Sequence, residues 1–426
     1  MRILQLSDAH LESPLSSLPR EKAQIRRAEL RGTLCRAILE AEKESCALAL
    51  LPGDLFDQNF ASEATVAALC EAFQKAGGVR FFIAPGNHDP LGPRSPYRFA
   101  EWPENVHIFK KPEMEEVALT LGGEEVSVWG CAGLPRPYDR EPLRGFAVRD
   151  RARLNLGCVH GYVTGARAVP YGPIAPEEIR ASGLDYLALG HVHSYLPPRA
   201  AGGTVYGYAG CLEGRGFDEC GPKGVLLLEV EKGSVRHSFR PFSARQVHRI
   251  VVDITGARTS EAAAGLCAAA AEAHRDGTEL PEGIPPELLD EKGGVDLSRL
   301  RDAHGRWRGF LPGEAERPLP GERVEPRDLV RFELTGELPP EAEIDPATVS
   351  ALAGDYFHCE VELLARRAVD YEELAKESTL LGEFVRAGLA AREAAGTAEE
   401  RERAELALEY GYAALTGRKV EADGCH

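Results

Sequence analysis

Five short polar motifs, each placed after a run of apolar residues, constrain this 426-residue chain more than any other feature. The motifs are Asp8-Ala9-His10, Gly53-Asp54-Leu55-Phe56-Asp57, Gly86-Asn87-His88-Asp89, His160-Gly161 and Gly190-His191-Val192-His193. The runs at 3–6, 47–51, 79–84, 154–159 and 186–189 have the length and composition of buried strands. If these strands lie side by side in two stacked sheets, their carboxyl ends bring all five motifs to one edge, where α/β folds bind ligands.

Seven side chains in these motifs predict a site for two divalent metal ions. They are Asp8, His10, Asp54, Asn87, His160, His191 and His193. Carboxylate and amide oxygens combined with imidazole nitrogens suit manganese, iron or zinc better than calcium. Seven groups cannot fill two separate coordination shells, so we expect one carboxylate to bridge the ions. Such a positive centre would attract a phosphate ester, and a metal-bridging hydroxide would attack its phosphorus in line.

Each motif taken alone has a structural explanation. Asp-x-His and His-Gly occur mostly in turns, Gly-Asp after a strand is commonly a tight turn, and Gly-Asn is an ordinary loop signal. Five such motifs in order, each near the end of a predicted strand, favour the two-metal site over these separate explanations.

Together the motifs resemble those of the calcineurin-like metallophosphoesterase superfamily, over about residues 1–215. The stretch Leu4-Gln5-Leu6-Ser7-Asp8-Ala9-His10-Leu11, the Gly53–Asp57 box and the regions after the catalytic part resemble the SbcD or YhaO branch of DNA repair nucleases. In protein phosphatases of the superfamily an arginine normally follows the Gly-Asp-x-x-Asp box, whereas Gln58 stands at that position here.

The resemblance implies a division of the ligands. Asp8, His10, Asp54 and His193 would hold one ion, and Asp54, Asn87, His160 and His191 the other, with Asp54 as the bridge. His88 would stabilise the transition state or protonate the leaving oxygen, and Asp89 would orient the His88 ring. An imidazole suits this role because its pKa lies near the working pH. The alternative for His88 is a loop histidine that hydrogen-bonds to backbone.

The length and the charge distribution predict more than one domain. Residues 1–250 contain 30 basic and 30 acidic side chains, whereas residues 251–426 contain 20 and 37 and carry the whole net charge of −17. We expect an α/β catalytic domain over 1–245, a small α+β capping domain over 246–365, and a C-terminal helix-loop-helix over 366–426. The resemblance implies a four-layer αββα sandwich for the first of these.

The capping region carries local signals of both strands and helices. Strands at 224–230 and 235–242 are expected to close the catalytic part before it. Further strands are expected at 247–254, 329–334 and 356–363, with an Ala-rich helix at 260–274 and a helix capped by Asp345 that stops at Gly354. Capping boxes at Asp370 with Glu373 and at Thr397 with Glu400 predict two further helices, each with an apolar stripe. In the resembled complexes such a hairpin binds the coiled coil of an ABC-type ATPase of the SbcC or YhaN kind. The alternative is that the hairpin folds back on its own domain.

DNA is the expected substrate, although the chain is acidic overall. Basic residues that could line a phosphate track cluster at 20–31, at Arg94 and Arg98, and at 136–153 (Arg136, Arg140, Arg144, Arg149, Arg151 and Arg153). The alternative is that they are solvated faces of helices and loops. No helix-turn-helix or RNA-binding signature is found, so recognition of the backbone and of ends is expected.

Three functions remain open from the sequence. The leading prediction is a manganese-dependent DNA exonuclease or endonuclease of DNA repair that works with an ATPase subunit. The second is a phosphomonoesterase or a phosphodiesterase for small nucleotides on the same scaffold, and the third is a scaffold with little catalysis. Iron or zinc could replace manganese.

A cytoplasmic location without membrane attachment is expected. The sequence contains no apolar run long enough to span a bilayer, and a cleaved signal peptide would remove Asp8. The cysteines form no Cys-x-x-Cys pair, and several sit in apolar surroundings that suit reduced core residues. A homodimer through residues 63–75 is an alternative to the use of those apolar residues in the core.

Overall fold

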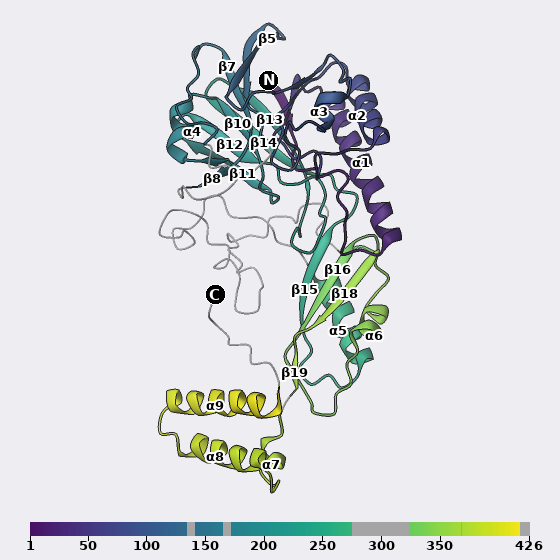
Figure 1. Ribbon diagram of the computed structural model, residues 1–426, viewed down its shortest axis with the longest axis vertical. Helices are drawn as coiled ribbons and strands as arrows, with labels where there is room; N and C mark the ends of the chain where they lie inside the picture. Colours follow the sequence, from purple (N-terminus) through teal and green to yellow (C-terminus); the bar gives the residue numbers. More distant parts are fainter. Residues whose placement is uncertain (134–140, 165–171, 275–323, 368, 418–426) are drawn as a thin grey trace.

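The computed structural model of the chain contains two six-stranded sheets that pack face to face (Figure 1). It describes residues 1–133, 141–164, 172–274, 324–367 and 369–417. The first sheet has the order β14-β13-β1-β2-β3-β4. Its strands are β1 (Arg2–Gln5), β2 (Leu48–Leu51), β3 (Arg80–Ile83), β4 (Val106–Ile108), β13 (Gly224–Glu231) and β14 (Ser234–Pro241).

The second sheet has the order β11-β12-β10-β7-β6-β5. Its strands are β5 (Glu115–Leu121), β6 (Glu124–Gly130), β7 (Leu154–His160), β10 (Tyr186–Gly190), β11 (Leu196–Ala201) and β12 (Thr204–Tyr208). A separate pair, β8 (Tyr162–Val163) and β9 (Pro173–Ile174), follows His160. All five strands predicted before the polar motifs are present, as β1, β2, β3, β7 and β10.

Helices cover the outer face of each sheet, so the catalytic part is a four-layer αββα sandwich as predicted. Alternate residues of each strand point to opposite faces. Ile3 packs between the two sheets, whereas Leu4 packs beneath α1 (Arg20–Lys43) and α2 (Glu63–Lys75). On the far side, α4 (Pro176–Ser182) covers the second sheet. The one-turn helix α3 (Pro96–Phe99) follows β3 and lies on the same side as α1 and α2.

The apolar side of α2 is used within this core. Its buried residues are Thr65, Val66, Leu69, Ala72 and Phe73. The helix therefore offers no large apolar stripe to a second copy of the chain, and the homodimer stays a prediction.

Parallel pairing places the polar motifs at one edge. β1 pairs in parallel with β2, and β2 with β3. In the second sheet β7 and β10 are parallel, with His160 opposite Gly190. Because parallel strands end at the same edge, the segments after β1, β2, β3, β7 and β10 meet there.

A second, smaller α+β unit follows the sandwich (Figure 1). It consists of three parallel strands, β15 (Val247–Asp253), β16 (Leu329–Thr335) and β18 (His358–Leu363), with α5 (Ser260–Ala273) and α6 (Pro346–Leu352) packed on one face. Two short strands, β17 (Glu337–Leu338) and β19 (Arg366–Arg367), pair beside it. We call β15, β16, β18, α5 and α6 the capping unit. Residues 275–323 of the predicted capping domain lie outside the described residues.

The C-terminal hairpin differs from the prediction at its start. The helix expected from Asp370 is divided into α7 (Tyr371–Leu374) and α8 (Leu380–Ala394), because Thr379 caps α8 by accepting a hydrogen bond from the Gly382 amide. The capping box of Thr397 and Glu400 is present and begins α9 (Ala398–Thr416). Helices α8 and α9 pack on each other through Val385 and Leu408 rather than folding back on the capping unit (Figure 1).

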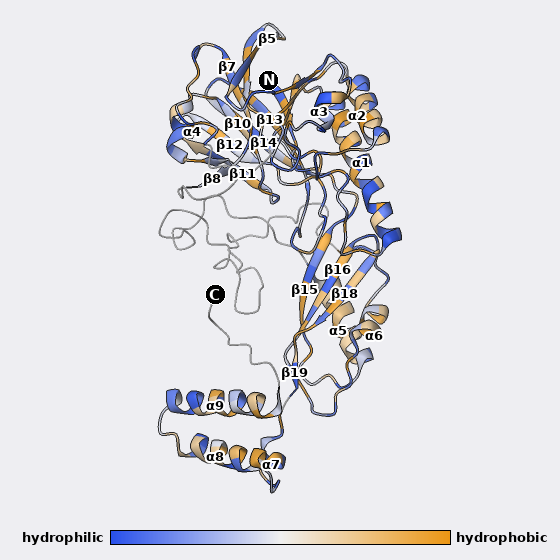
Figure 2. Cartoon of the chain, viewed as in Figure 1, coloured by the Kyte–Doolittle hydropathy of each residue, from blue (hydrophilic) through white to orange (hydrophobic). Residues whose placement is uncertain are grey.

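Hydropathy follows these layers. Figure 2 shows apolar residues concentrated on the strands, whereas the first turns of α1 are hydrophilic. Within the described ranges, the helices are all too short or too polar to cross a bilayer.

Candidate metal centre

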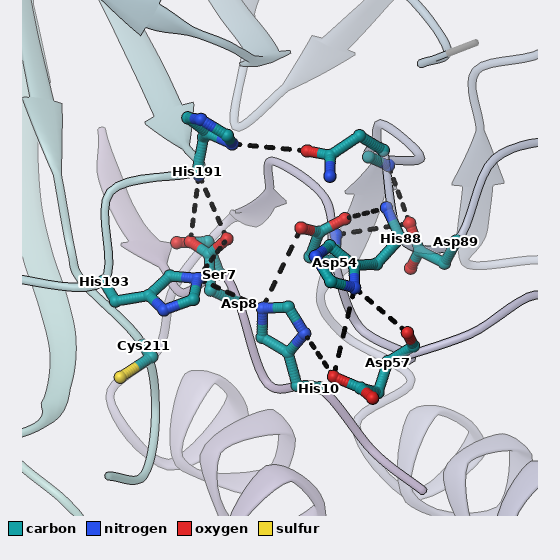
Figure 3. Close-up of polar contacts among 12 residues, drawn as sticks. Ser7, Asp8, His10, Asp54, Asp57, His88, Asp89, His191, His193 and Cys211 are labelled. Atoms are coloured by element: carbon teal, nitrogen blue, oxygen red, sulfur yellow. Dashed lines mark hydrogen bonds and ion pairs between the residues drawn. The ribbon is translucent and has the colours of Figure 1, made fainter. Parts of the chain in front are cut away.

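The seven predicted ligands lie together at the common edge of the two sheets. Figure 3 shows five of them, Asp8, His10, Asp54, His191 and His193. Asp8 and His10 follow β1, Asp54 follows β2, and Asn87 follows β3. His160 ends β7, and His191 and His193 follow β10. The sandwich therefore converts five separated motifs into one cluster.

One group of ligands surrounds the facing rings of His10 and His193. Their Nε2 atoms are 3.2 Å apart. Asp8 Oδ1 lies 3.9 Å from His193 Nε2, and Asp54 Oδ2 lies 3.8 Å from His10 Nε2. These four side chains are the set that the resemblance implies for one ion.

The second group surrounds Asn87. Its Oδ1 atom lies 2.8 Å from His160 Nε2 and 3.2 Å from His191 Nδ1. Asp54 Oδ2 is 3.4 Å from His160 Nε2, so the same carboxylate oxygen stands between both groups. Asp54 thus occupies the position expected of a bridging ligand.

The direction of the ring nitrogens tests whether these residues fit metal ions. His160 Nδ1 donates to the carbonyl of Pro52 at 3.0 Å, and His10 Nδ1 donates to Asp57 Oδ1 at 3.1 Å. A neutral imidazole that donates through Nδ1 carries a lone pair on Nε2. His160 Nε2 then faces the Asn87 oxygen, and His10 Nε2 faces His193 Nε2, so electron pairs point at one another. A cation between them resolves both contacts, and the donor set therefore fits two divalent ions.

The charges of the buried carboxylates support the same conclusion. Burial and the neighbouring charge of Asp54 raise the pKa of Asp8 well above its usual value. Burial also raises the pKa of Asp54. Ionised carboxylates in an interior need a compensating positive charge, which bound cations would provide.

Three of the four predicted ligand histidines, His10, His160 and His191, are held in the neutral form. Burial lowers the pKa of His10 and of His160 to about 4. Burial and the neighbouring histidines His160 and His193 lower the pKa of His191 to about 3. Neutral imidazole is the form that binds a metal ion.

Four of the seven ligands have backbone conformations that L-residues rarely adopt. The φ angles of Asp8, His10, Asp54 and His191 are 51°, 43°, 51° and 97°. Such positions each cost about 1–3 kcal/mol and cluster at functional sites. The strained backbone of these four residues is consistent with a functional site at this edge.

Gly53 allows a close approach between two of the ligand loops. Its φ is 91°, and a Cβ atom there would lie 2.4 Å from His160 Nδ1. Only glycine combines this conformation with that contact.

His88 lies at the edge of the centre with 45% of its side chain exposed. Its Nδ1 donates to the carbonyl of Asp57 at 3.0 Å, and its ring packs edge-on against His10. This orientation leaves Nε2 as the nitrogen that can exchange a proton with a substrate.

Asp89 does not orient His88, and this part of the prediction is wrong. The Asp89 carboxylate accepts hydrogen bonds from the amides of Asp54, Phe56 and Gly86 and from the Tyr97 hydroxyl. Burial and the charge of Asp54 raise its pKa to about 6. Asp89 therefore shapes the loop that carries Asp54, while Asp57 holds the His88 ring.

Two residues of the site were not predicted. Glu219 Oε1 accepts a hydrogen bond from His193 Nδ1 at 2.6 Å, and Arg215 Nη1 donates to Asp57 Oδ1 at 2.9 Å. Both lie in the segment between β12 and β13, outside the five strand-end motifs. No local pattern marks them, because their partners in the motifs are 26 and 158 positions away.

The sequence of the sandwich is similar to that of a known family. Residues 1–195 match the family model of the calcineurin-like phosphoesterases. This part of the chain is thus similar to the calcineurin-like phosphoesterases, and the match covers less than half of the chain.

Individual relatives show similarity over parts of the chain. The chain is 30% identical over 270 residues to the uncharacterized metallophosphoesterase YhaO of Bacillus subtilis (strain 168), a match that covers 62% of this chain and 65% of that protein. It thus spans slightly less than two thirds of this relative. Two solved structures from Thermus thermophilus are also similar. A hypothetical protein has 16% identity and a TM-score of 0.35, covering 56% of this chain and 98% of the other. A 5'-nucleotidase precursor has 14% identity and a TM-score of 0.30, covering 56% and 53%.

Proposed function

We propose that the chain is a manganese-dependent phosphodiesterase that cleaves DNA as an exonuclease or endonuclease in DNA repair. The observation that carries the proposal is the pair of ligand groups on either side of Asp54, whose lone pairs converge within 2.8–3.9 Å of one another. Two-metal sites of this kind serve displacement reactions at phosphorus.

The residues of the chain divide the work of such a reaction. Bound divalent ions would neutralise charge on the phosphoryl group and activate water as the nucleophile. Asp54 is held in place because its Oδ1 accepts a hydrogen bond from the His88 amide at 2.9 Å. His88, fixed through Nδ1 by the Asp57 carbonyl, would give a proton from Nε2 to the leaving oxygen.

Exposure at the site favours a long substrate over a small one. The side chains of His88 and His193 are 45% and 29% exposed. Sites for small molecules bury most of the ligand surface in a concave pocket. A phosphomonoesterase or a small-nucleotide phosphodiesterase remains the second candidate, because it would use the same ligands.

The N-terminal half of α1 offers a contact for the DNA backbone. Arg27 and Arg31 line a hollow of about 200 Å³ together with Leu11, which follows the ligand His10. By contrast, Arg153 is held by Glu125 and Ser127 within the second sheet, in line with the structural alternative for its cluster. Arg136 and Arg140 lie outside the described residues.

We further propose that the C-terminal hairpin binds the coiled coil of an SbcC- or YhaN-like ATPase. Apolar side chains on both helices stay exposed after the helices have packed on each other: Leu380 at 75%, Leu406 at 43%, Tyr410 at 37% and Leu415 at 46%. Figure 2 shows apolar residues along both helices of the hairpin. An amphipathic partner helix could cover them.

The nine described cysteines are free thiols, which supports the proposed cytoplasmic location.

The function is tested by hydrolysis of linear double- and single-stranded DNA with added Mn²⁺. Para-nitrophenyl phosphate and bis-para-nitrophenyl phosphate are assayed in parallel. His88→Ala is the test variant, and His237→Ala, an exposed histidine on β14, is the matched control. We expect wild type and His237→Ala to cleave DNA equally, and His88→Ala to lose about 10²-fold or more.

Other outcomes would redirect the proposal. Turnover of the monoester without cleavage of DNA, either alone or with a coiled-coil ATPase present, would favour the small-molecule enzyme. Binding of Mn²⁺ without turnover of any substrate would favour a scaffold role.

A further inference from the structure

The segment Cys211–Glu219, between β12 and β13, reaches the metal centre through Arg215 and Glu219, two charged residues to which the predicted reaction assigns no role. Arg215 Nη1 donates to Asp57 Oδ1 at 2.9 Å, and Arg215 Nη2 donates to Glu219 Oε1 at 2.7 Å. One guanidinium group therefore connects two carboxylates.

The same two carboxylate oxygens hold the two facing ligand histidines. Asp57 Oδ1 accepts from His10 Nδ1 at 3.1 Å, and Glu219 Oε1 accepts from His193 Nδ1 at 2.6 Å. The Nε2 atoms of these rings then meet at 3.2 Å. Arg215, Asp57, His10, His193 and Glu219 therefore form a closed ring of side-chain contacts, with Arg215 at one end and the predicted ion at the other.

We propose that Arg215 is a positioning residue that locks His10 and His193 into the orientation needed to bind one ion of the pair. Carboxylates that hold ligand histidines fix the tautomer and direction of the ring, and their loss commonly costs about 10–100-fold in metal affinity. Arg215 orders both carboxylates at once, so its effect reaches both rings. The inference rests on the proposed metal-dependent function and concerns the ion held by Asp8, His10 and His193.

The geometry requires a guanidinium rather than any cation. Arg215 donates through Nη1 to one carboxylate and through Nη2 and Nε to the other, with Nε 3.3 Å from Glu219 Oε2. A planar fork can span two acceptors, whereas the ammonium of lysine is a single point charge on a flexible stem. The side chains of Arg215, Asp57 and Glu219 are only 17%, 13% and 5% exposed, so water competes weakly for these bonds.

The segment is held firmly enough to act as a support. Glu213 is fully buried and accepts hydrogen bonds from Arg26, Thr33 and the Ala244 amide. Phe217 lies against the capping unit, with the Arg331 guanidinium 4.4 Å from its ring centroid. The position of Arg215 is therefore fixed by contacts of Glu213 and Phe217, two residues before and two residues after it in the segment.

The test measures metal binding rather than activity. Metal-free protein is titrated with MnCl₂ by calorimetry, and the Co²⁺-loaded protein is compared by visible absorption, which reports the geometry of the ligands. The variants are Arg215→Gln and Arg215→Lys, and the matched control is Arg236→Gln, whose side chain is 72% exposed and pairs with Glu229 on the sheet. Thermal unfolding confirms that each variant folds.

We expect wild type and Arg236→Gln to bind two ions. Arg215→Gln should bind one of them about 10–100-fold more weakly, with a changed Co²⁺ spectrum, and leave the other unchanged. Arg215→Lys should remain impaired because it lacks the fork. Two ions bound with wild-type affinity and spectrum by Arg215→Gln would overturn the inference.

Two further outcomes are distinguishable. If Arg215→Gln does not fold, Glu219→Gln gives the same comparison, since it keeps an oxygen acceptor for His193 but removes the charge that faces Arg215; unchanged binding there would also overturn the inference. A wild-type chain that binds no Mn²⁺ would overturn the proposed function and this inference with it.

Discussion

Arg26 and Glu213 form an ion pair inside the protein, although 187 positions separate them. Arg26 Nη2 lies 3.0 Å from Glu213 Oε2, and the two side chains are 1% and 0% exposed. Removing Glu213 would take away the fully buried counter-charge of Arg26 and leave it only the part-exposed Glu29. The pair joins α1 to the 211–219 segment and so supports the wall of the metal centre.

Glu213→Ala should therefore lower the free energy of unfolding by about 3–5 kcal/mol. Urea denaturation followed by circular dichroism measures the loss. Glu229→Ala is the control, because Glu229 is 44% exposed and its pairs with Arg2 and Arg236 lie on the surface. Glu229→Ala should lower the free energy of unfolding by less than about 1 kcal/mol. Equal losses in the two variants would show that the buried pair contributes no more than a surface pair.

Glu29 should make stability depend on pH in the acid range. Burial raises the pKa of Glu29, but hydrogen bonds from Arg245 and Arg26 outweigh burial and bring the pKa below its usual 4.5. The unfolded chain then binds the proton more readily than the folded chain, so this stabilisation is present above pH 4.5 and is lost as the pH falls through the folded pKa. Glu29→Gln should be less stable than wild type at neutral pH, and the difference should shrink in acid. Urea midpoints of both proteins across this range check the sign, and a difference that does not change with pH would contradict it.

Asp8→Asn should separate stability from metal binding. The raised pKa of Asp8, caused by burial and by Asp54, indicates that its charge is unfavourable in the metal-free protein. Asparagine keeps an oxygen that can accept from the His191 amide, as Asp8 Oδ1 does at 3.0 Å. The metal-free variant should melt at a higher temperature than metal-free wild type. Mn²⁺ should stabilise wild type by about 2.7 kcal/mol for each bound ion at a free concentration of 100 times its Kd, and the variant by much less. Equal stabilisation of both proteins by Mn²⁺ would exclude Asp8 as a ligand.

Gly53→Ala should damage the site through contact rather than through backbone conformation alone. The added Cβ would meet the His160 ring at 2.4 Å. Gly233→Ala is a matched control, because Gly233 has a φ of 74° but nothing lies within 4 Å of the added atom. In both variants the positive φ should lower the free energy of unfolding by about 1–2 kcal/mol. Only Gly53→Ala should also weaken Mn²⁺ binding. Calorimetric titration of both variants distinguishes the two effects, and normal Mn²⁺ binding by Gly53→Ala would show that the loop can move away.

The sequence predicted the parts of the site that depend on strand ends. The seven ligands follow apolar runs, and once the runs are strands in two sheets the convergence of their carboxyl ends follows from the topology. The four-layer arrangement was implied by the family resemblance, whereas the Thr397 capping box followed from a local pattern. The split between α7 and α8 was missed because the cap at Thr379 lacks the acidic residue of a capping box.

The partners of the ligands were less predictable. Asp89 lies next to His88 in sequence, yet its carboxylate is taken up by the amides of Asp54, Phe56 and Gly86, and the backbone of Asp57 holds the His88 ring instead. Arg215 and Glu219 contact motifs that are distant in the chain. Such contacts depend on how loops pack in three dimensions, which spacing along the sequence does not reveal.

The order of these residues along the chain has a consequence for biosynthesis. The seven predicted ligands are synthesised first, the last of them being His193. Arg215 and Glu219 follow, and β13 and β14, which close the first sheet, are synthesised after them. A prematurely terminated chain can thus contain every metal-binding side chain and still lack the group that aligns His10 with His193. Full assembly of the centre is delayed until the sandwich is complete, so an unfinished chain lacks part of the support for the predicted metal site.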